Sequence, residues 1–141
     1  MVNSLFFDFY GTIAIYGDMD VGEGETWRII YNYIKERGKS IDYEEFLDKW
    51  EGIFKINLNL DDLSHETVLL TKIEMLLEYF GVETKKEKIK DIGIRCLENW
   101  HKYIDFPQEL NEILGELSNR YSLALVSNFD HPPYLIKLLK D

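Results

Sequence analysis

The sequence predicts an α/β fold in which two parallel strands form the core and a block of helices is inserted between them. One apolar run near the N-terminus, Leu5–Phe7, ends in a carboxylate, and a second, Leu123–Val126, ends in small polar side chains. The long segment between these runs has apolar residues at helical spacing. Because strands joined by a helical crossover pair in parallel, both runs are expected to end at the same edge of the sheet.

The first element is a strand that ends at Asp8. Its apolar run, Leu5–Phe7, is typical of a strand that is covered on both faces. Gly11 then permits a tight turn and a close approach of the backbone to a ligand. A carboxylate at this end of a strand can attack an electrophilic carbon or phosphorus and form a covalent intermediate. The same pattern is equally typical of a strand followed by an ordinary turn, so the motif alone leaves both interpretations open.

Four amphipathic helices are expected between about Gly22 and Tyr103, and together they predict a helical bundle. The first helix begins near residues 24–26 and ends before Gly38, and the third ends before Gly81. The aromatic residues on the apolar faces are interpreted as core. The N-caps expected for the second, third and fourth helices are Asp42, Ser64 and Thr84.

The pattern changes after Pro107. Leucines and isoleucines at helical spacing predict a helix from about Leu110 to Leu117, and the second apolar run, Leu123–Val126, predicts a buried strand. A final short helix begins at the Pro132-Pro133 pair, because proline is tolerated in the first turn. Ser127 would then lie at the same edge of the sheet as Asp8.

Composition excludes several classes of function. The net charge of −10 argues against nucleic acid and anionic membranes as partners, because both need basic patches. Cys96 is the only cysteine, so no internal disulfide can form, as expected in a reducing compartment. The N-terminus lacks the pattern of a signal peptide, and no apolar run is long enough to span a bilayer. We therefore expect a cytoplasmic protein without a nucleic acid or membrane partner.

The segment Asp8–Thr12 (DFYGT) resembles the first signature of the haloacid dehalogenase (HAD) superfamily, and Val126–Asn128 (VSN) resembles its second. The helical insertion resembles the cap domain that members of this family carry after the first strand. The resemblance implies an incomplete Rossmann-like HAD core with an inserted four-helix cap. The core would comprise residues 1–14 and 105–141, and the cap residues 15–104.

The resemblance implies roles for individual residues. Asp8 matches the nucleophile, which forms an ester or an acyl-phosphate, and Thr12 matches the residue that steadies the nucleophile loop. Ser127 matches the residue that binds the anionic group of the substrate, and Asn128 follows it as in the dehalogenase branch. Arg28, which follows a tryptophan, resembles the cap arginine that reaches the substrate carboxylate or the departing halide, although a surface arginine would give the same pattern.

Tyr10 distinguishes two enzymatic interpretations. HAD phosphatases usually have an aspartate at this position, which protonates the alkoxide leaving group, and tyrosine is a poorer acid. A halide needs no proton, so Tyr10 favours the dehalogenase-like subgroup and a 2-haloacid substrate without a cofactor. The alternative is a phosphatase acting on a small phosphorylated metabolite, in which Asp8 and the Tyr10 carbonyl would hold Mg²⁺.

The later motifs of the family, a lysine and an acidic pair, have no match in the sequence. Lys137 and Lys140 are interpreted as solvated helix residues, and Asp130 and His131 as turn or helix-start residues. We therefore expect little turnover from this chain alone, and self-association or a completing C-terminal segment as its partner. A further alternative is a catalytically incomplete HAD-like interaction module. A phospho-accepting receiver domain is disfavoured, because it lacks such an insertion.

The remaining candidate residues are assigned no catalytic or binding role in this interpretation. Cys96 lies on an apolar helical face and is expected to be an inert core thiol. The segment Gly22–Gly24 lacks the context of a nucleotide-binding loop. The histidines show no spacing typical of a metal site: His65, His101 and His131.

Overall fold

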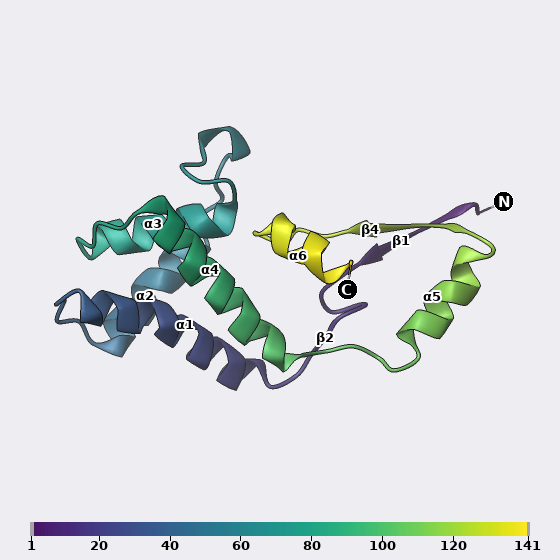
Figure 1. Cartoon of the computed structure of the whole chain (residues 1–141), viewed down its shortest axis with the longest axis horizontal. Helices are drawn as coiled ribbons and strands as arrows, with labels where there is room; N and C mark the ends of the chain where they lie inside the picture. The colour runs from purple at the N-terminus through teal and green to yellow at the C-terminus, as the bar shows by residue number, and fades with distance from the viewer. Residues whose placement is uncertain (1, 141) are drawn as a thin grey trace.

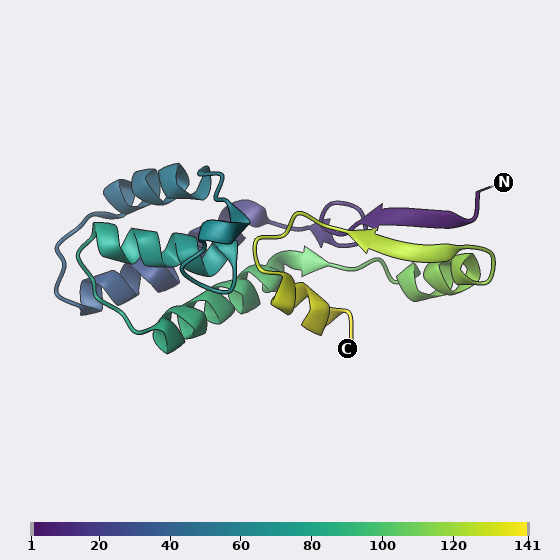
Figure 2. The ribbon, with the colours of Figure 1, turned by 90° about the horizontal axis from the view of Figure 1, so that it is seen from above.

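The computed structural model describes residues 2–140 and has two parts that lie end to end (Figure 1). One part is a bundle of four helices, and the other holds the paired strands and two further helices (Figure 2). The bundle consists of α1 (Met19–Glu36), α2 (Tyr43–Phe54), α3 (Val68–Tyr79) and α4 (Lys86–Trp100). The other part consists of β1 (Ser4–Asp8), α5 (Leu110–Ser118), β4 (Ser122–Val126) and α6 (Pro132–Leu138). The mixed α/β class predicted from the sequence is confirmed.

The two main strands pair in parallel, as predicted. In their register Ser4 lies opposite Ser122, and Asp8 lies opposite Val126. Gly11 follows β1 in a turn with φ of +84°, a conformation that favours glycine. The strands therefore end together, and the segments that follow them leave the sheet at the same edge.

The expectation that these strands are covered on both faces is wrong. Phe7 and Leu125 face a cluster of buried residues that includes Phe9 and Leu135. The opposite face is open: Phe6 is 72% exposed, and Val126 beside Asp8 is 57% exposed. The continuous apolar run indicated a doubly covered strand, but within residues 2–140 the sheet has only one buried face. Asp8 points to the open face, because side chains alternate along a strand.

The helical bundle has its own core, which includes Ile34, Phe46, Trp50, Leu76 and Ile92. The apolar periodicity therefore identified the four helices and most of their buried faces. The helices also end where predicted after α1 and α3, at Gly38 and Gly81, which both have positive φ.

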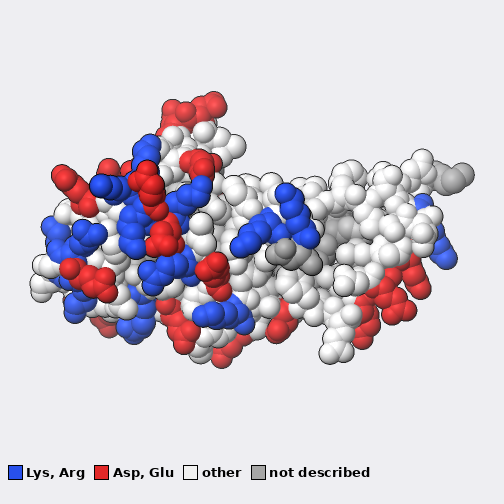
Figure 3. All heavy atoms as spheres, viewed as in Figure 1, with Lys and Arg blue, Asp and Glu red and all other residues white. Residues whose placement is uncertain are grey.

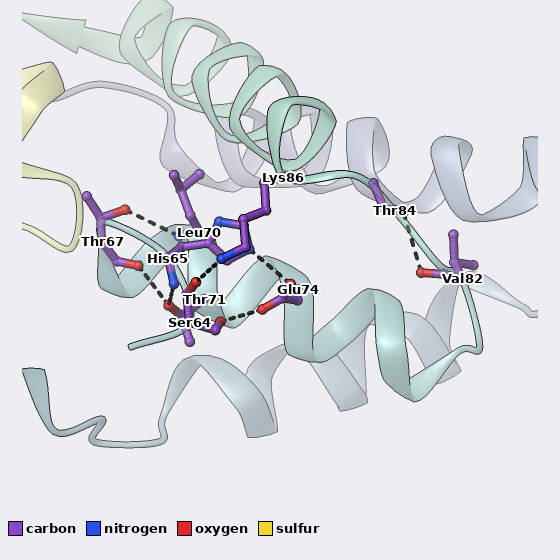
Figure 4. A network of polar contacts seen from close by, with 9 residues as sticks. All are labelled: Ser64, His65, Thr67, Leu70, Thr71, Glu74, Val82, Thr84 and Lys86. Carbon is purple, nitrogen blue, oxygen red and sulfur yellow. Dashed lines mark hydrogen bonds and ion pairs between the residues drawn. The ribbon is translucent and has the colours of Figure 1, made fainter. Parts of the chain in front are cut away.

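Three of the predicted helix starts are wrong. The first helix begins at Met19, capped by Asp18, rather than near residues 24–26. Thr67, not Ser64, caps α3, because the Ser64 hydroxyl donates to Glu74 instead (Figure 4). Thr84 does not cap α4, since its hydroxyl donates to the Val82 carbonyl at 3.4 Å. By contrast, Asp42 caps α2 as predicted and accepts from the Glu45 N–H at 2.8 Å.

Two short strands join the parts and were not predicted. β2 (Ile15–Tyr16) pairs antiparallel with β3 (Ile104–Asp105), next to a hydrogen bond from the Gly17 N–H to the Tyr103 carbonyl at 2.8 Å. Two 3₁₀ turns complete the described elements, η1 (Leu60–Asp62) and η2 (His101–Tyr103). The predicted boundaries at residues 15 and 104 fall in β2 and β3, and the division of the chain into domains there stays a prediction.

Charged side chains of both signs cover the helical part on the face drawn in Figure 3, and acidic side chains gather over α5. This mixed surface agrees with the negative net charge of the sequence. Among residues 2–140, no helix has the length and apolar character that crossing a bilayer requires.

Candidate active site

A cavity of about 960 Å³ lies between the carboxyl ends of β1 and β4 and the helical bundle. The strands and the segments after them contribute polar groups, including Asp8, Tyr10, Ser127 and Asn128. All four helices of the bundle contribute side chains to the opposite wall, Trp27 and Phe54 among them. The aromatic residues of the bundle are therefore only partly core, because some of them line this cavity.

Asp8 and Ser127 are brought together at the edge of the sheet. Asp8 ends β1 opposite Val126, and Ser127 is the next residue along the chain. Asp8 is exposed, and its Oδ1 accepts a hydrogen bond from the Phe9 N–H at 2.8 Å. Asp8 is also one of the residues that line the cavity. The arrangement supplies a nucleophile and a hydroxyl at one end of the same cavity, and their catalytic roles stay predictions.

Tyr10 is held by a hydrogen bond with His101, with 2.8 Å between its hydroxyl and Nε2. Burial raises the pKa of Tyr10 above its ordinary value of 10.0, and the neighbouring Tyr134 and Tyr16 raise it further. Burial also lowers the pKa of His101 below 6.5. Both rings are therefore neutral at neutral pH, and Tyr10 is a weak proton donor. The sequence singled out Tyr10 but gave no signal for His101, which lies far along the chain.

Two of the predicted site residues lie away from the cavity. The Arg28 guanidinium lies over the ring of Tyr43, with 4.1 Å between its Cζ and the ring centroid, and Arg28 does not line the cavity. Thr12 is exposed in the turn after β1, where its N–H donates to the Phe9 carbonyl at 3.3 Å. The expected meeting of Arg28 with Asp8 and Ser127 in one cleft is therefore absent from this arrangement.

The segment after Ser127 is attached to α3 by a group of buried and partly buried polar contacts. Lys72 Nζ donates to Asp130 Oδ2 at 3.0 Å and to the Phe54 carbonyl at 2.8 Å. Thr67 Oγ1 lies 2.8 Å from Nδ1 of His131, and burial lowers the pKa of this histidine. Asp130 and His131 thus connect the sheet to the bundle, and His131 also precedes α6 as its N-cap residue, in agreement with the predicted helix-start role. The sequence gave no signal for Lys72, because a lysine in a helix is usually solvated.

A metal ion would find few protein ligands here. Within residues 2–140, no three His, Cys, Asp or Glu side chains come close enough together to hold an ion. Asp8 offers one carboxylate, whereas Asp130 is engaged with Lys72. Mg²⁺ can bind through one carboxylate together with substrate phosphate and water, so the residues present fit such a site only with a phosphorylated substrate.

Comparisons with known proteins identify the fold. No family model matches the sequence, and no curated protein does. A solved structure of 2-haloacid dehalogenase from Pseudomonas syringae pv. tomato DC3000 is similar over 93% of this chain and 57% of its own, with a TM-score of 0.53 and 12% identity. The fold is HAD-like.

A second HAD-like structure, the magnesium-bound HAD-hydrolase YfnB from Bacillus subtilis, matches 99% of this chain and 59% of its own, with a TM-score of 0.49 and 16% identity. The chain therefore spans 57% and 59% of these two solved proteins. The HAD-like fold agrees with the incomplete Rossmann-like core that the motifs around Asp8 and Ser127 predicted.

Proposed function

We propose that this chain provides the nucleophile and cap of a HAD-like hydrolase, most like a 2-haloacid dehalogenase, which forms a covalent intermediate on Asp8. The observation that carries the proposal is the pairing of β1 with β4, which puts Asp8 beside the residue preceding Ser127. Both side chains line one cavity. The HAD-like fold supports this proposal, and the function is inferred from the site residues.

In the proposed reaction, a carboxylate oxygen of Asp8 attacks the carbon that bears the halogen. A carbon–oxygen bond forms, the carbon–halogen bond breaks, and the halide leaves with the bonding electrons. Water then attacks the carbonyl carbon of the ester, which releases the hydroxy acid and a proton and restores the carboxylate. Ser127 and Asn128 would hydrogen-bond the substrate carboxylate and hold the reacting carbon in line with Asp8.

Tyr10 supports halide displacement over phosphate ester hydrolysis. Its raised pKa and its hydrogen bond with His101 make it a poor acid for an alkoxide leaving group. The second candidate is a Mg²⁺-dependent phosphatase in which Asp8 binds both the phosphoryl group and the metal. In that case Mg²⁺ would supply charge neutralisation on the phosphate oxygens.

A third candidate is a catalytically incomplete interaction module. The open face of the sheet, with Phe6 and Val126 exposed, supports a requirement for a covering partner. That partner would be a completing segment or a second copy of the chain, and turnover by the chain alone would be slow.

Incubation with a panel of small 2-haloacids and phosphate esters, with and without Mg²⁺, tests these candidates. Intact mass and the release of halide or phosphate are measured for the wild type and for Asp8→Asn. The dehalogenase proposal predicts a mass increase with haloacids that is independent of Mg²⁺ and lost in Asp8→Asn. Phosphate release that requires Mg²⁺ would support the phosphatase, and a folded chain without any adduct would support the interaction module.

A further inference from the structure

The cavity continues from Asp8 to a group of aromatic side chains on α1 and α2. Trp27 lies 5.1 Å from Trp50 and 6.1 Å from Phe54, measured between ring centroids, and Trp50 lies 5.5 Å from Phe54. We call these three residues the aromatic wall. Trp50 is buried, whereas Phe54 is 43% exposed and Trp27 is half-buried. The wall therefore presents the surfaces of Trp27 and Phe54 to the cavity.

Phe54 is fixed in place although it lies at the end of α2. Lys72 Nζ donates to its carbonyl at 2.8 Å and lies 4.8 Å from the centroid of its ring. Lys72 is itself buried and paired with Asp130, which also lines the cavity. Exposure of an apolar phenylalanine ring to water is unfavourable, so a ligand that covers the ring would be stabilised. The Phe54 backbone is held in a position from which the ring lines the cavity.

Further lining residues of the cavity are aromatic as well. Tyr10 lies 5.1 Å from Trp100, and Tyr16 lies 6.2 Å from Trp100, measured between ring centroids. All three line the same cavity as the aromatic wall. A volume of about 960 Å³ is at the upper end of the range for ligand sites, which is about 300–1,000 Å³. A haloacid of two or three carbons would leave most of this space unfilled.

The charged residues near the aromatic wall do not favour a second anionic group on the substrate. Glu23 lies one helical turn before Trp27, and Glu51 is next to Trp50 in the sequence. Lys55, the cation among the lining residues, pairs with Glu51 at 3.4 Å. The two cations near the wall, Lys55 and Lys72, are each paired with a carboxylate already, so neither is set aside for an anion, whereas an uncharged ring would cover apolar surface.

We propose that the aromatic wall is the subsite for an uncharged aromatic group carried by the substrate of the proposed Asp8 reaction. The substrate class is then a 2-haloacid with an aryl substituent, whose carboxylate and halogen lie at the Ser127 end and whose ring contacts Trp27 and Phe54. The placement of the substrate carboxylate and halogen rests on the proposed function, whereas the placement of the substrate ring rests on the aromatic wall alone.

Binding of unreactive probes tests the subsite separately from catalysis. We compare 3-phenylpropanoate with propanoate by NMR titration, following the tryptophan indole N–H signals, in wild type, Phe54→Ala and Phe106→Ala. Phe106 is the matched control because it is 46% exposed and does not line the cavity. We expect 3-phenylpropanoate to bind about tenfold or more tightly than propanoate, since burying a ring contributes over about 1.4 kcal/mol. Phe54→Ala should remove most of this preference, and Phe106→Ala should keep it.

Equal affinity for the two probes, or equal losses in Phe54→Ala and Phe106→Ala, would overturn the subsite. Asp8→Asn should leave the preference for 3-phenylpropanoate intact, because the ring does not depend on the nucleophile. If the probe preference holds but no haloacid forms an adduct, the proposed reaction fails while the aromatic subsite stands. If adducts form but the probes show no preference, the subsite fails while the reaction stands.

Discussion

The contact between Lys72 and Asp130 gives the sharpest test of how the bundle is attached to the sheet. The Lys72 side chain is only 6% exposed, whereas that of Asp130 is 32% exposed. Removing one partner therefore has unequal consequences. In Lys72→Met the carboxylate can be hydrated and the apolar stem is kept, but in Asp130→Asn a buried ammonium loses its counter-charge.

The magnitudes follow from this difference in burial. Breaking a fully buried pair costs about 3–5 kcal/mol, and we expect Asp130→Asn to approach the lower end of that range. Lys72→Met should cost about 1–3 kcal/mol, mainly through the Phe54 carbonyl and the Asp130 carboxylate that lose a donor. The double variant should cost less than the sum, with a coupling of about 0.5–3 kcal/mol.

Urea unfolding followed by circular dichroism measures these differences in the free energy of unfolding. Lys55→Met is the matched control, because the Lys55–Glu51 pair is exposed and should contribute about 0–1 kcal/mol. Equal effects of Lys72→Met and Lys55→Met, or simple addition of the two single effects at Lys72 and Asp130, would contradict a stabilising pair between Lys72 and Asp130.

Three further predictions concern packing and titration. Gly93→Ala should lower the free energy of unfolding, because a Cβ there would lie 2.5 Å from a methyl carbon of Leu70. Gly52→Ala should raise the free energy of unfolding by about 0.5–1 kcal/mol, because Gly52 has open space around it. Thermal unfolding checks this, since the two variants should shift the midpoint in opposite directions. Cys96 should react with a thiol reagent only after unfolding, because burial raises its pKa to about 12, and rapid labelling of the native chain would contradict this. Burial lowers the pKa of His101 and His131 below 6.5 in the folded chain, so the unfolded state binds more protons and stability should fall as the pH drops from about 7 towards 5. A free energy of unfolding that stays constant or rises over that interval, measured in urea, would count against the buried state of both rings.

The parallel strands were predictable from sequence because each feature is local or follows from topology. Two apolar runs, one ending at Asp8 and the other before Ser127, are enough to predict parallel pairing when a helical crossover connects them. The cap of α2 was predictable for the same reason, since Asp42 reaches only to Glu45.

The remaining features depend on contacts between distant segments. Ser64 has the side chain of a helix cap, but its hydroxyl is taken by Glu74, and Thr67 caps α3 instead. Burial of Lys72 depends on Asp130, which lies 58 residues away. The open face at Phe6 could not be read from an apolar run, because such a run says nothing about which helices cover it.

Tandem mass spectrometry that locates the covalent adduct decides which carboxylate is the nucleophile. After reaction with an aryl-substituted 2-haloacid, we expect an ester on Asp8, and no ester in Asp8→Asn. An ester on Glu23 or Asp130, which line the same cavity, with Asp8 unmodified, would contradict the assignment of Asp8 as the nucleophile.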